Sequence, residues 1–261
     1  AFRQNIETRD IKYVDYQIKA STADRNAVAK EMNDFQKQLS TASDPSIIVS
    51  KSSSAIPYLG VPVSSKAYQQ YPDIASKIDS LAIGTTGVIE NKQDNTLNII
   101  RVLSKAQLPD SVQFRQIQIA ANTPDEARVK ADSIQKALAA GANFETLAKR
   151  YGQTGEKVWF TGQQYEGAPS MSQDNRTFIN ALLNGEVNAV QNVSLAQGNI
   201  ILQVLDKKDF KTKTTAAVIK KLIDFSKSTR GEAYNKFSEF VAKSTTAADL
   251  EKNAGKYGYR V

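Results

Sequence analysis

The chemistry open to this chain is limited by two residue types that are absent from its sequence. The 261 residues include no His and no Cys. Ser-His-Asp and Cys-His triads and disulfide bonds are therefore excluded, and most zinc and iron sites lose their usual ligands. Any catalysis must use carboxylates, Lys, Tyr, Ser or binding energy, and we predict no catalytic residue, no cofactor and no metal.

The Gly-rich segment GQTGEK, residues 152–157, lies between a helical pattern and Trp159, the only tryptophan. It lacks the G-x-x-x-x-G-K-[ST] spacing of a phosphate-binding loop, so nucleotide binding is not indicated. The carboxylates form no spaced cluster of the kind that binds Ca²⁺ or Mg²⁺. The role of this short loop must therefore come from its context.

Composition favours a protein that binds other proteins over one that binds nucleic acid or inserts into a membrane. The net charge is +7, and its densest patch is KKDFKTK, residues 207–213. A basic stripe interleaved with aromatic residues is missing, so we expect attraction to acidic surfaces but no nucleic-acid partner. No apolar run approaches the roughly 20 residues that span a bilayer. The polar start AFRQNIETRD is not a signal peptide, and it is compatible with removal of a preceding anchor.

Sequence patterns repeat at an offset of about 100 residues. Strand-like runs at 11–18 and 112–119 each precede an amphipathic helix, with apolar residues at steps of 4, 3 and 4. The two helical faces are Val28, Met32, Phe35, Leu39 and Ala127, Ala131, Ile134, Leu138. Gly84 and Gly185, each after a short helical pattern, are 101 residues apart. This register favours a tandem duplication, and the alternative is two unrelated α+β units with similar turns.

The predicted organisation has three parts. The repeats occupy residues 1–107 and 108–209, joined by the polar linker SKAQLPDS. Residues 210–261 form a C-terminal extension that begins with an alternating strand pattern. A capping box at Thr229 and Glu232, and a second pair at Thr246 and Asp249, predict two helices.

The second repeat resembles a parvulin-type peptidyl-prolyl isomerase domain, most clearly in GANFETLAKRY, NGEV and the closing Gly-plus-apolar strand. Nearly the whole chain is similar to the PpiD/SurA-type family of periplasmic isomerases and chaperones, and is closest to the PpiD-like proteins of Bacteroidetes. The resemblance implies an α+β fold of two tandem parvulin-like domains, each a small antiparallel sheet flanked by helices, plus the C-terminal strand and helices.

The resemblance also implies a substrate-binding groove, but its usual histidines are replaced. Gln116 and Ile200 stand where the family has His, Leu182 replaces a phenylalanine, and Phe178 is retained. The implied substrate-binding residues are Gln116, Trp159, Phe160, Met171, Phe178, Leu182 and Ile200. The alternative is that they are ordinary core residues. The active-site loop of the family is shortened here to a connector over 152–157.

The first repeat departs further from the family. Asp15 stands at its first His position, and the Tyr-rich segment 52–72 replaces the active loop. This segment either forms an exposed adhesive surface or packs on the first sheet. Isomerisation crosses an amide barrier of about 18–20 kcal/mol without a nucleophile, so the loss of His does not by itself abolish activity.

The leading hypothesis is therefore a periplasmic folding factor that binds unfolded or proline-containing envelope polypeptides with weak or no isomerase activity. We expect it to be part of a longer inner-membrane-anchored protein. The alternatives are an active isomerase that works without His and a structural spacer module.

Overall fold

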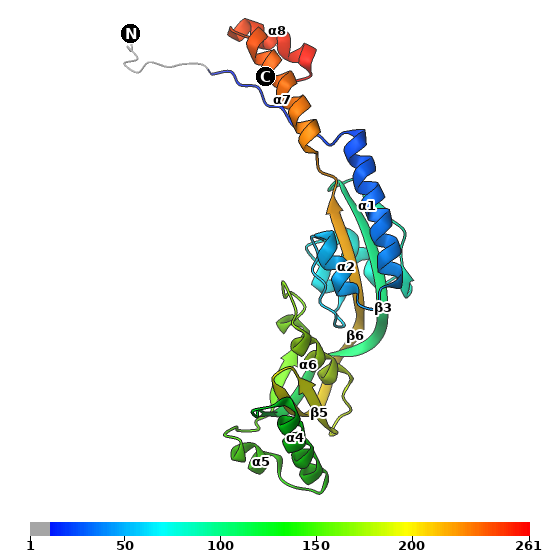
Figure 1. Cartoon of the computed structure of the whole chain (residues 1–261), viewed down its shortest axis with the longest axis vertical. Coiled ribbons are helices and arrows are strands. Elements are labelled where there is room, and N and C mark those ends of the chain that lie inside the picture. Colours follow the sequence, from blue (N-terminus) through cyan, green and yellow to red (C-terminus); the bar gives the residue numbers. More distant parts are fainter. Residues whose placement is uncertain (1–10) are drawn as a thin grey trace, which may run out of the picture. The chain divides into compact units, whose positions relative to one another are not determined.

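The computed structural model describes residues 11–261, which form two compact units (Figure 1). One unit is Asn33–Lys221, and the other combines Leu222–Val261 with the described residues up to Met32. Among these residues no helix is both long enough and apolar enough to cross a membrane. Residues 1–10, which the sequence indicates to be a polar start and not a signal peptide, lie outside the described residues.

Two long strands, β3 (Thr96–Ile119) and β6 (Gly198–Leu222), form the centre of the sheet in the larger unit. The sheet order is β1-β3-β6-β5, and β2 and β4 also pair with β3. The outer strands are β1 (Gly84–Thr85), β2 (Ile89–Asn91), β4 (Val158–Thr161) and β5 (Val190–Leu195). Side-chain hydrogen bonds join Arg115 to Gln203, Ser111 to Asp209 and Gln107 to Thr212. The residue numbers fall along β3 while they rise along β6, so the two strands run antiparallel.

The predicted linker SKAQLPDS is wrong, because residues 104–111 lie inside β3. Ser104, Ala106 and Gln107 are exposed, so the polar composition marks a solvent-facing stretch of strand and not a break. The backbone stays extended because β6 pairs with β3. The expected limits at residues 107 and 209 both fall within these strands.

The predicted strand over residues 11–18 is also wrong, since its only β pairing within the described residues is an isolated bridge from Asp15 to Arg260. The place beside the first half of β3 is taken by the second half of β6. Lys220 donates to the hydroxyl of Thr96 and Gln107 donates to that of Thr212. The strand predicted after residue 210 is therefore confirmed as the second half of β6, and it pairs with the first half of β3. The tandem duplication itself stays a prediction.

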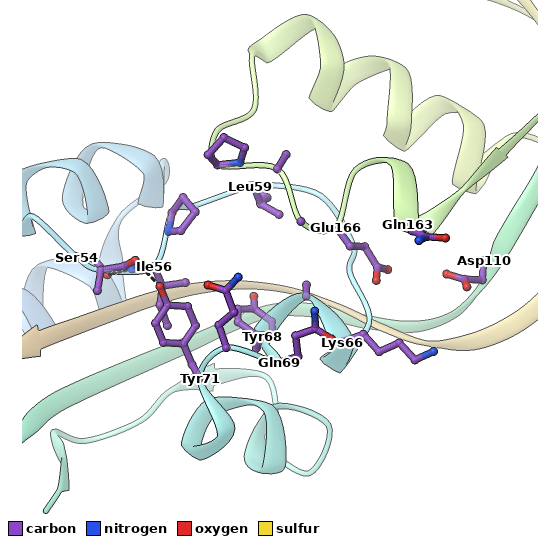
Figure 2. Close-up of a pocket in the computed structure, with 17 residues that line it drawn as sticks. Ser54, Ile56, Leu59, Lys66, Tyr68, Gln69, Tyr71, Asp110, Gln163 and Glu166 are labelled. Carbon is purple, nitrogen blue, oxygen red and sulfur yellow. Dashed lines mark hydrogen bonds between the residues drawn. The ribbon is translucent and has the colours of Figure 1, made fainter. Parts of the chain in front are cut away.

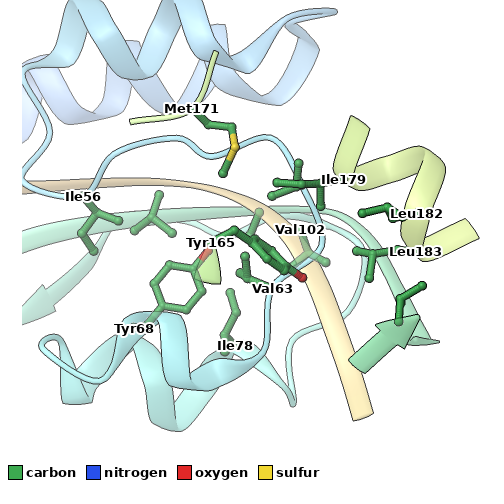
Figure 3. Packing of buried hydrophobic residues seen from close by; sticks show 14 of the residues in the cluster. Ile56, Val63, Tyr68, Ile78, Val102, Tyr165, Met171, Ile179, Leu182 and Leu183 are labelled. Carbon is green, nitrogen blue, oxygen red and sulfur yellow. The ribbon is translucent and has the colours of Figure 1, made fainter. Parts of the chain in front are cut away.

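Helices cover both faces of the sheet's second half. Helix α6 (Gln173–Asn184) contributes Ile179, Leu182 and Leu183 to one apolar cluster, which includes Leu202 of β6 (Figure 3). The other face carries α4 (Pro124–Ala139) and α5 (Phe144–Arg150), packed on Ile117, Ile119 and Ile201. Strand alternation explains this division, because neighbouring residues point to opposite faces.

The predicted helix starts hold at two of three places. Thr123 caps α4 by accepting from the backbone N–H of Glu126, and Thr246 caps α8 (Ala247–Tyr257) in the same way. The third start is wrong: Ser226, not Thr229, caps α7 (Lys227–Lys243). The Thr229 hydroxyl instead donates to Asp24 at 2.6 Å. In this smaller unit an aromatic cluster joins Tyr16, Phe237, Phe240, Tyr257 and Tyr259.

The remaining helices belong to the N-terminal half. Helix α1 (Thr22–Thr41) buries Met32 and Leu39 completely, as its apolar spacing predicted. Helices α2 (Pro45–Ser52) and α3 (Pro72–Ile78) flank the Tyr-rich segment, which contains the short 3₁₀ helix η1 (Ser65–Tyr68). A second 3₁₀ helix, η2 (Gly162–Gln164), follows β4.

Candidate functional site

Five of the predicted groove residues meet in one apolar cluster on the α6 side of the sheet. Leu182 is 0% exposed, Ile200 7% and Met171 9%, and Phe160 and Phe178 pack against them. The cluster brings together β4, β6, α6 and the segment before α6. The positions are therefore neighbours, as the resemblance implied, but their burial leaves little open groove. Their role in binding stays a prediction.

Aromatic packing fixes the side chains of this cluster. The Phe178 ring lies edge-on to Phe114 at 5.6 Å and to Phe160 at 6.2 Å between centroids. Phe160 stacks on Tyr165 at 5.6 Å, with only 6° between the ring planes. Such pairs add stability beyond the area they bury. The face is therefore a rigid apolar surface.

Gln116, at the first position where the family has His, lies on β3 two residues beyond Phe114 and so faces the same side of the sheet. Its Oε1 atom is buried and accepts no hydrogen bond from the described residues. Neither this amide nor the Ile200 side chain can exchange a proton near neutral pH. The cluster therefore offers no acid or base at these two positions.

Trp159 does not join this cluster. It pairs with Gln113 on β3, whereas its neighbour Phe160 pairs with Val112, so the two side chains leave β4 on opposite faces. The indole is 39% exposed, and the amine of Lys208 lies 4.7 Å from its ring centroid. The expectation that Trp159 borders the same groove as Phe178 is therefore corrected.

The connector over 152–157 is fixed to the edge of the sheet. Gly152 and Gly155 have φ of 69° and 64°, which favours glycine, and an added Cβ at Gly155 would meet Ala148 at 2.9 Å. The Gln153 amide accepts from the backbone N–H of Gln118 at 2.8 Å and donates to its carbonyl at 2.7 Å. A single side chain thus imitates a strand partner, and the loop serves as a short connector.

Part of the Tyr-rich segment covers the apolar cluster; we call residues 56–64 the strap. Its Ile56, Val61 and Val63 side chains are at most 3% exposed and belong to the same cluster as Met171 and Leu182. The alternative that the segment packs on the first sheet is confirmed in part, because the buried Tyr68 lies in one cluster with Ile100 and Val102 of β3, but the strap also packs on α6. The signals that could have revealed it are two prolines and Gly60, whose φ is 70°.

Hydrogen bonds hold the main chain of the strap. Arg176 donates from Nε to the carbonyl of Leu59 at 2.8 Å and from Nη2 to that of Tyr58 at 3.1 Å. The Tyr165 hydroxyl donates to the carbonyl of Pro62 at 2.8 Å. At the end of the strap, the N–H and hydroxyl of Ser64 donate to the Glu166 carboxylate at 2.8 and 2.6 Å. The three residues that bind the strap here, Arg176, Tyr165 and Glu166, lie on α6 or between β4 and α6.

A buried charged network that sequence reasoning missed adjoins the strap. Lys213 is 0% exposed in its side chain and donates to Asp110 at 2.8 Å, Glu166 at 2.6 Å and the Tyr165 hydroxyl at 3.1 Å. Burial alone would lower the pKa of Lys213, but its bonds to Asp110 and Glu166 outweigh this and raise it. Burial raises the pKa of Tyr165 to about 12. These shifts keep the Lys213 amine charged and the Tyr165 phenol neutral near neutral pH.

The lysines of the predicted basic patch over 207–213 bond to other residues of the same chain. Lys211 also pairs with Asp110, Lys207 donates to the carbonyl of Leu183, and Lys208 pairs with Asp206 at 3.3 Å. All four lysines of this segment thus have intramolecular partners. Among the described residues, no group of three or more Asp or Glu side chains could hold a metal ion.

A cleft of 940 Å³ opens beside the strap and the charged network (Figure 2). Its lining includes the apolar and aromatic residues Pro57, Leu59, Tyr68 and Tyr71 and the polar residues Lys66, Gln69, Gln163 and Glu166. The Tyr71 hydroxyl donates to the carbonyl of Ala55 at 2.8 Å, so the ring is held in place. The volume of the cleft is that of a site for a drug-sized molecule or a few peptide residues.

Comparison with known proteins identifies one domain. Residues 97–208 match the family described as the PPIC-type PPIase domain, so the chain contains a parvulin-type peptidyl-prolyl isomerase domain. A peptidylprolyl isomerase (PrsA) from Bacillus anthracis is similar at 15% sequence identity over 90% of this chain and 99% of that chain, with a TM-score of 0.30. No curated protein sequence matched.

Proposed function

We propose that this chain is a folding factor that holds unfolded or proline-containing polypeptides and has weak or no isomerase activity. The observation that carries the proposal is the 940 Å³ cleft, which lies between the Tyr-rich segment, with its proline, leucine and tyrosine side chains, and residues of the PPIC-type domain such as Gln163 and Glu166. A cleft that combines apolar and aromatic side chains with polar groups such as Lys66, Gln69 and Glu166 can contact both the side chains and the main chain of an exposed stretch of unfolded polypeptide.

The assignment of a subfamily, a cellular compartment and a class of clients rests on the sequence. Its resemblance to the PpiD/SurA-type chaperones, and to their Bacteroidetes members, supports a periplasmic site of action within a longer protein anchored in the inner membrane. The clients are then unfolded or nascent envelope polypeptides. The offset of about 100 residues between the two helical faces supports an origin from two parvulin-like halves.

Weak isomerase activity follows from the apolar face. Leu182 is 0% exposed and Ile200 is 7% exposed, so a prolyl peptide finds little free surface there. Gln116 and Ile200 also lack the proton chemistry of His. Exchange of a short X-Pro peptide takes tens to hundreds of seconds without catalyst, and we expect the protein to leave this rate nearly unchanged. NMR exchange spectroscopy measures it, and acceleration equal to that of an ordinary parvulin contradicts this part of the proposal.

Client holding is tested by aggregation of a chemically unfolded model protein diluted into buffer. We expect the wild-type chain to suppress light scattering and Tyr71→Ala to suppress it less, because Tyr71 lines the cleft. Tyr234→Ala is the matched control, since Tyr234 lies on α7 and is 62% exposed. Equal suppression by both variants, or none by the wild type, rejects the cleft as the holding site.

A further inference from the structure

We propose that the strap, residues 56–64, is a resident peptide ligand of the PPIC-type domain and that an extended client segment binds by taking its place. The proposal rests on the proposed function and adds the site, the ligand class and the residues that recognise it. The ligand is an extended polypeptide with spaced aliphatic side chains and a proline, and the main-chain recognition residues are Arg176 and Tyr165.

Recognition through the main chain makes the site tolerant of sequence. Three donors from Arg176 and Tyr165 reach the carbonyl oxygens of Tyr58, Leu59 and Pro62. Every residue of a client carries a carbonyl, so these bonds do not depend on which side chains the client brings. A folding factor with many clients needs this kind of contact.

The apolar contacts define the ligand's side chains. Val61 and Val63, two positions apart, are 1% and 2% exposed. They belong to the cluster that contains Met171, Ile179 and Leu182, shown with Val63 in Figure 3. An extended segment with two aliphatic residues at this spacing would bury the same area. Pro62 lies between the two valines.

Most of the strap lacks regular secondary structure. Between Ser52 and Ser65 its regular pairing is the single bridge of Val63 to Thr214, and before it Ala55 donates to the carbonyl of Lys220 at 3.0 Å. The residues between these two anchors are held by the side chains of Arg176 and Tyr165 and by burial. A client that takes its place must therefore supply the same carbonyl contacts and the same apolar burial.

The experiment weakens the strap while leaving its site intact. The substitution is Gly60→Ala, since Gly60 has a φ of 70° and an added Cβ would lie 2.9 Å from Arg176 Nε. The probe is a fluorescein-labelled, C-amidated peptide with the sequence of the strap, IPYLGVPVS. We expect the full-length Gly60→Ala protein to bind it about tenfold more tightly than wild type in an anisotropy titration, because its own strap competes less well.

Two further variants separate this effect from general loosening. Gly87→Ala is the matched control, because an added Cβ there meets nothing within 4 Å, and it should bind the probe as wild type does. Gly60→Ala combined with Arg176→Ala should lose the gain, because the clamp on the probe's carbonyls is removed. A gain in Gly87→Ala, or one that survives Arg176→Ala, overturns the proposal.

Hydrogen exchange on the wild-type protein decides the matter if Gly60→Ala does not fold. Saturating probe should speed exchange of the amides of residues 58–64, because the strap is displaced. Bound probe with unchanged exchange there, or no probe binding at all, overturns the proposal. Displacement by the probe without suppression of client aggregation leaves this site standing and rejects the folding-factor function instead.

Discussion

The amine of Lys213 donates to Oε1 of Glu166 at 2.6 Å, with side-chain exposures of 0% and 8%. The two residues come from the second half of β6 and from the turn after η2. Glu166 also accepts from Ser64 at the end of the strap. One carboxylate thus joins three segments that are distant in the sequence, and its removal is expected to be costly.

Glu166→Gln should lower the free energy of unfolding by about 2–3 kcal/mol. The substitution removes the charge of Glu166 from a buried ion pair, but Asp110 still pairs with Lys213. The loss of stability is therefore smaller than that for a buried charge left without any partner. Urea unfolding followed by circular dichroism measures it. The control is Glu145→Gln, whose partner Arg115 is 3.7 Å away and whose side chain is 53% exposed; it should cost less than about 1 kcal/mol. Equal losses contradict the buried network.

Gly162→Ala should destabilise the protein by about 2 kcal/mol or more, because a Cβ at this position would lie 2.3 Å from Oδ1 of Asp110 and 2.9 Å from Nζ of Lys213. The network must then move or break. Gly167→Ala, where nothing lies within 4 Å of the added atom, should change stability by less than about 0.5 kcal/mol. Thermal unfolding compares the two variants, and a wild-type midpoint for Gly162→Ala contradicts the prediction.

The acid dependence of stability should include a contribution from Asp110. Burial alone would raise its pKa, but hydrogen bonds from Lys211 and Lys213 outweigh burial and hold the pKa below its ordinary value. A depressed pKa stabilises the fold above the unfolded pKa, about 3.9, and this stability is lost as pH falls through the folded pKa. The difference in unfolding free energy between wild type and Asp110→Asn should therefore stay constant from pH 8 to about 5 and shrink below about pH 4.

Urea titrations of both proteins across this range measure that difference. Asp206→Asn is the control, because Asp206 lies outside the network and its side chain is 45% exposed. A wild-type advantage over Asp110→Asn that grows on acidification has the wrong sign and contradicts the prediction.

Trp159 emission should not respond to peptide bound on the strap's site. The indole leaves β4 on the face opposite Phe160, so displacement of the strap does not change its surroundings. Lys208→Ala should shift the emission, because it removes the amine 4.7 Å from the ring. Fluorescence during the peptide titration, with anisotropy as the independent measure of binding, tests both statements. A saturable emission shift on binding restores the original expectation that Trp159 borders the groove.

The sequence by itself determined the elements whose signals are local. The apolar spacing of Met32 and Leu39 placed one face of α1, and Thr123 and Thr246 marked two helix starts, because a cap acts within one helical turn. The absence of His restricted the chemistry before any fold was known. The family-specific positions also identified Met171, Phe178, Leu182 and Ile200 as neighbours.

Only the tertiary structure decided which segments lie side by side. The segment 104–111 reads as a linker, yet it is strand because β6 pairs with it, and residues 11–18 read as a strand, yet β6 occupies the place beside β3. Strand pairing is non-local, and alternating residues fit any available edge equally well. For the same reason the clamp at Arg176 and the Lys213–Glu166 pair had no signal in the sequence, since their partners are separated by 47 to 118 positions.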